Sequence, residues 1–251
     1  MKTLDETRTD LAEYERVFLA DGQPRYLFRG QKQQHGTITS TFARLPKDDA
    51  VLTDQAHTVY RRGHQIGQGL RGYRIRPLEG AALLQHYGWP TPLIDVTGVV
   101  EVAIFFALYS ATVGHEAVVY VIDRQELPGD IVVVDHDFLT HEVSDGALRH
   151  RWLRQDGFAI APGDWQVPDR TSPFDLLSSR CARAITPHPF LVRRDDVPAI
   201  RDLLDQSEDP IPMHLQNLLR LYCVHQFGDE LHPYLKGIVD EIPDQPRAGG
   251  A

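Results

Sequence analysis

Two short runs rich in β-branched residues, near the middle of the chain, constrain its fold most. They are residues 117–122 and 131–134, and Asp, Gly or Pro residues bound both of them. Branched side chains suit the pleated surface of a strand, and an uninterrupted apolar run suits a strand that is covered on both faces. We therefore expect both runs to be central strands of one buried sheet.

Helical spacing of apolar residues surrounds these runs on both sides. The segments that it predicts to be helical are 5–20, 59–70, 78–87, 99–107, 174–185, 197–204, 213–223 and 230–242. Residues 25–29 and 190–193 look like short strands, and 89–98 looks like a loop. Because strands and helices do not alternate regularly, we expect an α+β fold with a mixed, mainly antiparallel central sheet, flanking helices and a helical C-terminal part.

Composition limits the classes of function. The chain has 251 residues and a formal net charge of −9, which suits one compact unit and gives no general attraction to nucleic acids or anionic membranes. Its apolar stretches are shorter than the roughly 20 residues that span a bilayer. Two cysteines, Cys181 and Cys223, cannot form a disulfide framework, and no secretory signal pattern is evident. We therefore expect a cytoplasmic protein without membrane contact.

Familiar catalytic motifs are missing from the sequence. It contains neither the G-x-S-x-G elbow of serine hydrolases nor a phosphate-binding loop of the G-x-x-x-x-G-K-[ST] type. Residues 67–72 match G-x-G-x-x-G, but a helical pattern precedes them where a dinucleotide site needs a strand. His141-Glu142 lacks the second histidine of H-E-x-x-H, so we expect no metal site.

Two polar segments are attached to strongly apolar elements, and such segments often carry function. The first is Phe28-Arg29-Gly30-Gln31. An arginine at the end of a strand, followed by a glycine that allows close approach of a ligand, is a candidate holder of an anion. The alternative is a structural arginine that pairs with a core carboxylate such as that of Asp95. The sequence leaves both readings of Arg29 open.

The second polar segment runs from residue 84 to residue 97 and contains His86, Tyr87, Asp95 and Thr97. Tyr87 is predicted to anchor the loop through its hydroxyl, whereas the role of His86 stays open. Thr97 directly precedes a helix expected to begin near Gly98. Its hydroxyl is therefore predicted to cap the free N–H groups of that helix.

These segments resemble the FRG domain family. Phe28 to Gln31 fits the family's opening F-R-G motif, and residues 85–97 with 103–107 are similar to its motif Q-H-[YF]-G-x-P-T-R-L-L-D-W-T and the following helix. Arg151, Gln155 and Gly157, and later residues 231–237, resemble its closing signatures. This chain departs from the family at three positions, Pro92, Val96 and Val100.

The resemblance implies an organisation and a setting. It implies an FRG domain over residues 25–243, preceded by an N-terminal helical segment, 1–24, and followed by a flexible tail, 244–251. The family is associated with prophages and with bacterial toxin or antiviral defence contexts. We therefore expect an effector that meets a macromolecular acceptor or a neutralising partner protein.

The layout of the motifs is also similar to that of ADP-ribosyltransferases, which implies NAD as co-substrate. On that similarity the catalytic residues are Arg29, Thr97 and Gln155. The residues expected to bind the nucleotide are Phe28, Gly30, Gln31, His86, Tyr87, Asp95 and Arg151. A neutral amide stabilises positive charge less well than a carboxylate. Gln155 would then orient a hydroxyl while Asp156 or Asp95 supplies negative charge.

Two other classes of function remain. The first is a non-catalytic module that senses a nucleotide or a phage component through the two polar segments. An Arg29 that is already occupied by Asp95 would favour it, whereas convergence of Arg29, Thr97 and Gln155 would favour the transferase. The second is a nucleic-acid-processing enzyme that uses a local basic patch. The residues of that patch would be Arg61, Arg62, Arg71, Arg74 and Arg76.

Overall fold

The computed structural model describes residues 2–68, 76–86, 88–109, 111–135, 157–167, 174–196 and 210–240. The helices are α1 (Leu4–Glu15), α2 (Ala50–Arg61), α3 (Gly63–Gln68), α4 (Pro77–His86), α5 (Val100–Leu108), α7 (Pro210–Phe227) and α8 (Pro233–Asp240), with short 3-10 helices η1 (Phe42–Arg44), η3 (Arg194–Asp196) and η5 (Gly228–Glu230). The strands are β1 (Tyr26–Gln31), β2 (Ile94–Thr97), β3 (Glu116–Asp123), β4 (Ile131–Asp135), β5 (Gly157–Pro162) and β6 (Ile185–Leu191). The predicted α+β class is confirmed.

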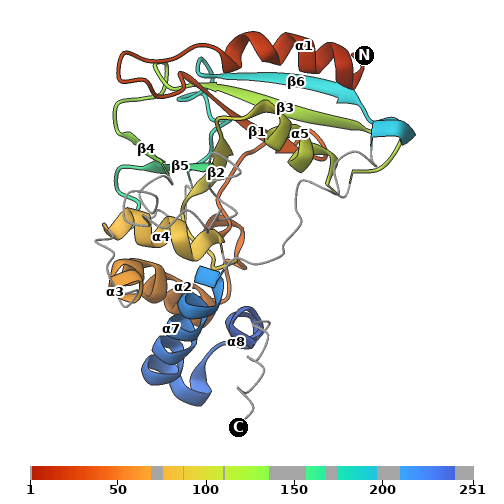
Figure 1. Ribbon diagram of the computed structural model, residues 1–251. Coiled ribbons are helices and arrows are strands. Elements are labelled where there is room, and N and C mark those ends of the chain that lie inside the picture. The colour runs from red at the N-terminus through yellow and green to blue at the C-terminus, as the bar shows by residue number, and fades with distance from the viewer. Residues whose placement is uncertain are drawn as a thin grey trace, which may run out of the picture.

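All six strands form one sheet in the order β4-β5-β2-β1-β3-β6, and each neighbouring pair is antiparallel. The pair β1–β3 aligns six residues, whereas β1 and β2 share one aligned pair, Phe28 with Thr97. The sheet therefore consists of two ribbons, β4-β5-β2 and β1-β3-β6, that meet at one point. Figure 1 shows the ribbons diverging on either side of it.

Helices α1 and α5 cover one face of the ribbon β1-β3-β6. Phe28, Val119 and Phe190 pack there with Leu11 of α1 and Ala103 of α5. Each fully buried side chain of this kind contributes about 1.5–3 kcal/mol through its removal from water. Helix α5 lies so close to β1 that a Cβ atom on Gly30 would collide with the main-chain carbonyl oxygen of Ala103. The absence of a side chain at position 30 therefore permits the contact.

Among the described residues, connecting segments without helices cover the opposite face of the sheet. Leu27, Tyr120 and Phe158 are buried on this face, and they pack against residues of two connecting segments, such as Ile38 and Leu176. The main-chain N–H groups of Ile38 and Leu176 tie these segments to each other. Because side chains alternate along a strand, Leu27, Arg29 and Gln31 share this face, whereas Phe28 and Gly30 face α5.

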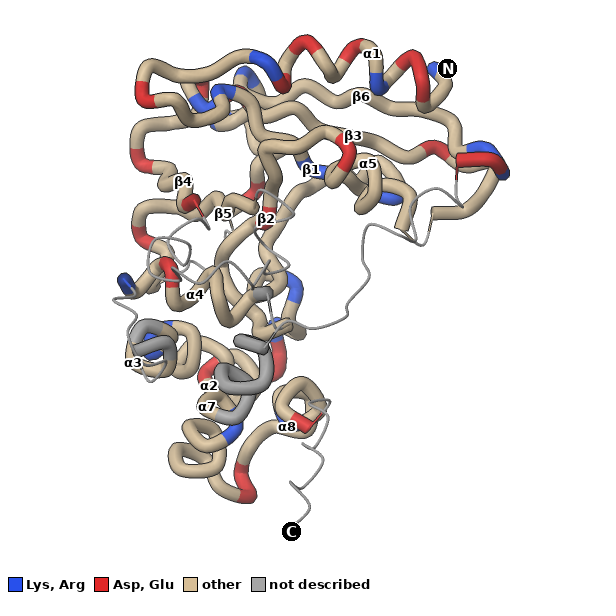
Figure 2. Tube along the Cα trace, in the orientation of Figure 1, with Lys and Arg blue, Asp and Glu red and all other residues tan. Residues whose placement is uncertain are grey.

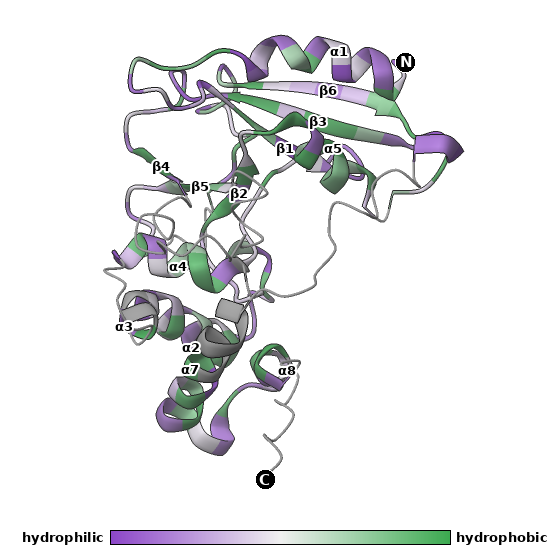
Figure 3. Ribbon diagram, viewed as in Figure 1, coloured by the Kyte–Doolittle hydropathy of each residue, from purple (hydrophilic) through white to green (hydrophobic). Residues whose placement is uncertain are grey.

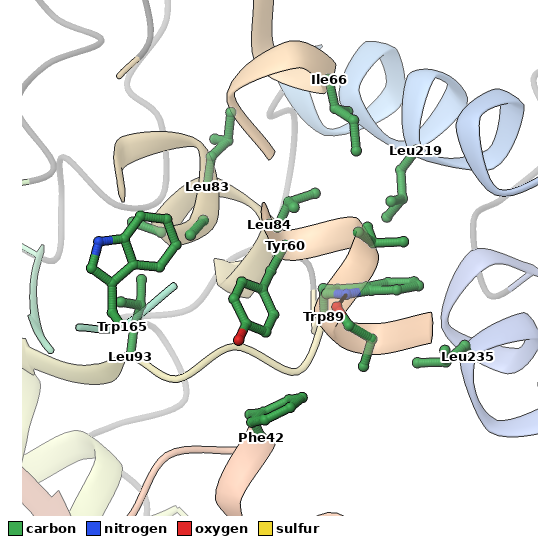
Figure 4. Packing of buried hydrophobic residues seen from close by; sticks show 14 of the residues in the cluster. Phe42, Tyr60, Ile66, Leu83, Leu84, Trp89, Leu93, Trp165, Leu219 and Leu235 are labelled. Atoms are coloured by element: carbon green, nitrogen blue, oxygen red, sulfur yellow. Dashed lines mark hydrogen bonds between the residues drawn. The ribbon is translucent and has the colours of Figure 1, made fainter. Parts of the chain in front are cut away.

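The remaining helices form a separate layer against the ribbon β4-β5-β2. Helices α2, α3, α4, α7 and α8 gather there (Figure 1), and their core is continuous with Val134 of β4 and Ala161 of β5. Aromatic rings fill its centre, where Tyr60 packs edge-on against Phe42 with ring centroids 5.3 Å apart (Figure 4). Because the layer contains α7 and α8, the predicted helical C-terminal part is confirmed. No helix of the described residues is long and apolar enough to cross a bilayer.

Two strand predictions need correction. Residues 131–134 form the predicted strand, but β4 is an edge strand, and Val132 is 37% exposed. Residues 89–98, predicted as a loop, contain β2, which lies between β1 and β5. A strand of four residues with prolines just before it gives little local signal, so its partners decide its conformation.

The predicted helix over residues 174–185 is wrong. The Asp175 carboxylate accepts hydrogen bonds from the main-chain N–H groups of Ile38 and Leu177, which holds this segment in turns. The chain then enters β6, which is polar along much of its length (Figure 3) and contains Pro187 and Pro189. Prolines fit an edge strand because their missing N–H groups can face away from the ladder.

The first prediction concerns the contact between α5 and β1. Replacing Gly30 with Ala should lower the free energy of unfolding by at least about 2 kcal/mol, because the added methyl group overpacks a backbone contact. Chemical denaturation of both proteins measures the difference. Gly36→Ala is the matched control, since nothing lies within 4 Å of a Cβ at that position. Equal losses in the two variants would contradict the proposed cause.

The second prediction concerns His188 of β6, which packs against Tyr14 of α1 with ring centroids 5.7 Å apart. Burial lowers the pKa of His188; Lys2 adds to this effect and Asp10 opposes it. The folded state therefore binds fewer protons at this site than the unfolded chain, whose histidine titrates near 6.5. The stability that the neutral ring provides is present above about pH 6.5 and is lost as the pH falls below it. His188→Gln should flatten the loss of unfolding free energy between about pH 7.5 and 5.5. An unchanged pH dependence would contradict the assignment of this loss of stability to His188.

Candidate functional site

Arg29 lies on the loop-covered face of β1, opposite Tyr120 of β3. Its Nη1 donates a hydrogen bond to the main-chain carbonyl oxygen of Asp95, so the side chain crosses the gap between the two ribbons. The Arg29 Nε is buried and has no hydrogen-bond partner among the described residues. Arg29 is thus bound to Asp95, but through the backbone and not through the carboxylate expected for a structural ion pair.

The electrostatic surroundings of Arg29 are unusual for a buried cation. Burial lowers the pKa of its guanidinium; the Asp95 carboxylate opposes this effect, and the positive charge of Arg44 adds to it. A buried charge without an ion-pair partner is costly. An anionic partner would lower this cost, and the role of Arg29 as a holder of an anion stays a prediction.

Gly30 does not have the role predicted for it. Ala103 and Ala107 of α5 occupy the space beside it, so the close approach that this glycine permits is that of a helix and not of a ligand. Phe28 likewise faces the core beneath α5 and is fully buried. Both residues support β1 from behind, while Arg29 and Gln31 face the other way.

Thr97 and Asp95 lie on the face of β2 opposite to that of Arg29. Thr97 is aligned with Phe28 and with Gly157 of β5, so its side chain shares their face of the sheet. The Asp95 side chain has the same orientation by alternation and is exposed. The structure therefore brings the segments of Arg29 and Thr97 together but points the two side chains to different faces.

The predicted capping role of Thr97 is also corrected. Its hydroxyl accepts a hydrogen bond from the Val99 N–H at 3.1 Å, within the turn before α5. The residue in the N-cap position is Val99, which has no capping side chain. The first N–H group of α5, that of Val100, donates instead to Oε1 of Glu15 at 2.9 Å. A carboxylate of α1 thus caps α5, and its distance along the sequence hid it from local analysis.

Much of the second polar segment has a structural role. Gly88 ends α4 with a positive φ of 84°, which favours glycine. The Thr91 hydroxyl donates to the buried side-chain oxygen of Gln85, and the Trp89 indole N–H donates to the Ala56 carbonyl oxygen at 3.1 Å. These bonds position the approach to β2, on which Asp95 lies.

Four predicted site positions cannot be placed. Tyr87, Arg151 and Gln155 lie outside the described residues, and so does the side chain of His86. Of the expected basic patch, Arg71 and Arg74 also lie outside. Arg76 is paired with the buried carboxylate of Glu79, and basic positions are scattered among acidic ones over the described chain (Figure 2). No group of three potential metal ligands occurs in the described part.

A hollow of about 410 Å³ lies between β4 and the start of α4, and it is of a size that suits a small ligand. Arg124, Asp135 and Trp165 are among the residues that line it. The Arg124 guanidinium lies over the ring of Phe158, the residue after Gly157, and donates to the Pro24 carbonyl oxygen. Burial lowers the pKa of Arg124, so this cation too is only partly compensated.

Comparison with known proteins gives one match. Residues 24–115 match the family model of the FRG domain, which confirms the resemblance of the first two motifs. The matched stretch ends directly before β3 and excludes α1. No curated protein and no solved structure matches the chain. The closing signatures lie beyond residue 115, so the extension of the domain to residue 243 stays a prediction.

The cap of α5 gives the third prediction. Glu15→Ala should lower the free energy of unfolding by about 1 kcal/mol, because it leaves the Val100 N–H without its partner. Glu13→Ala is the control, since Glu13 is exposed on the same helix. Thermal or chemical unfolding measures the difference. Equal stability of the two variants would show that the cap is energetically unimportant.

Proposed function

Because the chain carries an FRG domain over residues 24–115, we propose that it is an NAD-using, ADP-ribosyltransferase-like or NAD glycohydrolase-like enzyme. Its proposed setting, a bacterial toxin or phage-defence system, follows from the FRG resemblance. The two cysteines, both free and buried, fit action in the reducing cytoplasm. A macromolecular acceptor or a neutralising partner protein belongs to the same proposal.

The adjacency of β1, β2 and β5 carries this proposal. These strands come from distant parts of the sequence, yet Thr97 is aligned with both Phe28, next to Arg29, and Gly157. Gln155 comes two residues before Gly157 in the sequence and lies outside the described residues. Arg29 and Thr97 therefore lie on neighbouring strands at the junction of the two ribbons, and the chain that carries Gln155 leads into the third strand, β5.

The chemistry assigns a role to each group. In the reaction the bond between ribose C1′ and the nicotinamide nitrogen breaks, its electron pair stays on that nitrogen, and neutral nicotinamide leaves. Water or an acceptor nucleophile then bonds to C1′ and loses a proton. Arg29 would hold the diphosphate, and Gln155 would orient a hydroxyl. Asp156, the other carboxylate that the sequence offers for this purpose, would stabilise positive charge at the ribose, because the Asp95 carboxylate points to the face of the sheet opposite to Arg29. Thr97 supports the turn between β2 and α5.

A binding module without catalysis is the second candidate. The hydrogen bond from Arg29 to the Asp95 carbonyl oxygen favours it, because that bond occupies part of the guanidinium. In this alternative the residues around Arg29 would recognise a nucleotide or a phage component without breaking a bond. The two candidates differ in whether nicotinamide is released.

The fourth prediction tests catalysis directly. Purified protein incubated with NAD, with and without cell lysate as a source of acceptor, should release nicotinamide. Gln155→Ala and Arg29→Lys should each reduce the rate by about 100-fold, since each removes a positioned donor. Arg29→Lys keeps the charge but loses the planar fork, and unfolding curves verify that each variant is folded.

A control variant and two outcomes complete the test. Arg61→Ala removes an exposed arginine of α2, far from the ribbon junction in sequence, and should leave the rate unchanged. Absence of release under both conditions would overturn the enzymatic proposal in favour of the binding module. Release that survives in folded Gln155→Ala would overturn the role of Gln155.

A further inference from the structure

We propose that Arg29, Arg44 and the hydroxyl of Tyr120 form a binding site for a phosphoryl anion, with Arg44 as its second cation. Nothing in the sequence motifs pointed to Arg44, which lies in η1. The existence of the anion site does not depend on catalysis. Its assignment to the diphosphate of NAD rests on the proposed function.

The position of Arg44 follows from the attachment of η1 to the chain before β2. The Phe42 N–H donates to the Thr91 carbonyl oxygen at 3.1 Å, and the Thr91 N–H donates to the Thr41 hydroxyl at 3.2 Å. Thr91 lies four residues before Asp95, whose carbonyl oxygen accepts the hydrogen bond from Arg29. The same stretch of chain therefore holds the Arg29 guanidinium directly and fixes the backbone of η1, which carries Arg44.

The two arginines are near each other, and neither forms an ion pair within the part of the chain that the structure describes. Arg44 lies close enough to Arg29 to lower the pKa of the Arg29 guanidinium. Arg44 is exposed, and its side chain makes no hydrogen bond or ion pair with the described residues. Two neighbouring like charges repel each other, and the repulsion is strongest where burial excludes water. An anion bound between them would convert this repulsion into attraction.

Unpartnered polar atoms lie beside these cations. The buried Nε of Arg29 has no hydrogen-bond partner among the described residues, and Tyr120 is aligned with Arg29 across β1 and β3. The main-chain N–H of His35 lies beside the Tyr120 oxygen, so this oxygen can accept a bond while its O–H donates to no described group. The Oε1 of Gln31, on the same face, is also buried without a partner. Buried polar groups are normally satisfied, so a cluster of unsatisfied groups indicates a missing partner.

The chemistry of these groups selects the ligand class. Burial raises the pKa of Tyr120, so its hydroxyl remains a hydrogen-bond donor at neutral pH. Two planar guanidinium groups with a hydroxyl donor suit the oxygens of a phosphoryl group, to which arginine donates paired hydrogen bonds. A diphosphate offers enough oxygens to contact both arginines at once.

The fifth prediction uses inorganic pyrophosphate as the probe and isothermal titration calorimetry of the full chain. Wild-type protein should bind it, and Arg44→Ala should weaken the affinity by about 10-fold or more, as expected for loss of one charge-assisted interaction. Arg194→Ala removes the same charge from an exposed position in η3 and should leave the affinity unchanged. Lack of binding by the wild type, or equal losses in both variants, would overturn the proposed site.

Tyr120→Phe adds a second readout. It removes a buried hydroxyl whose proton has no described acceptor, together with the contact between its oxygen and the His35 N–H. The unfolding temperature of the free protein should therefore change little, while its affinity for pyrophosphate falls several-fold. Unchanged affinity would remove Tyr120 from the site. Nicotinamide release, measured in parallel, separates the two proposals. Pyrophosphate binding without release leaves the anion site intact and contradicts only the enzymatic function, and release without pyrophosphate binding contradicts only the anion site.

Discussion

The contact between α5 and β1 at Gly30 determines how the rest of the site is arranged. The α5 backbone lies against Gly30 and covers the face of β1 on which Gly30 lies. Because side chains alternate along a strand, the preceding residue, Arg29, must face the opposite side of the sheet. Helix α5 in turn receives its cap from Glu15 of α1. A segment outside the matched FRG residues thus stabilises the helix that fixes the orientation of Arg29.

The junction of the two ribbons depends on few interactions. Strands β1 and β2 share one aligned pair, and the Arg29 guanidinium supplies a hydrogen bond where further ladder bonds would otherwise lie. Arg29 therefore has a structural role beside the functional one that we propose for it, because one nitrogen holds β2 while the buried Nε has no partner among the described residues. A fold that keeps a cation in this state accepts a loss of stability, as is common at functional sites.

Local patterns in the sequence were enough to predict α1, β1, β3, α7 and the end of α4 at Gly88, because periodicity and a glycine stop signal act within a few residues. They were not enough for β2, and the strand predicted at 190–193 overlaps only the end of β6, because the strands beside them decide their conformation. The candidate site divides in the same way. Arg29 is proposed from its motif, whereas Glu15 and Arg44 depend on contacts between segments far apart in sequence.

The net charge of −9 limits where this chain can bind an anion. The long-range field of such a chain repels anions, but salt screens it over a Debye length of about 8 Å at physiological ionic strength. A guanidinium that burial has partly stripped of water acts at short range in a medium of lower dielectric constant, where its attraction for an anion is stronger and less screened. An acidic protein can therefore bind a phosphoryl group where cations are concentrated and at least one of them is partly buried. Among the described residues, the junction of the two ribbons offers the partly buried Arg29 with the exposed Arg44 near it.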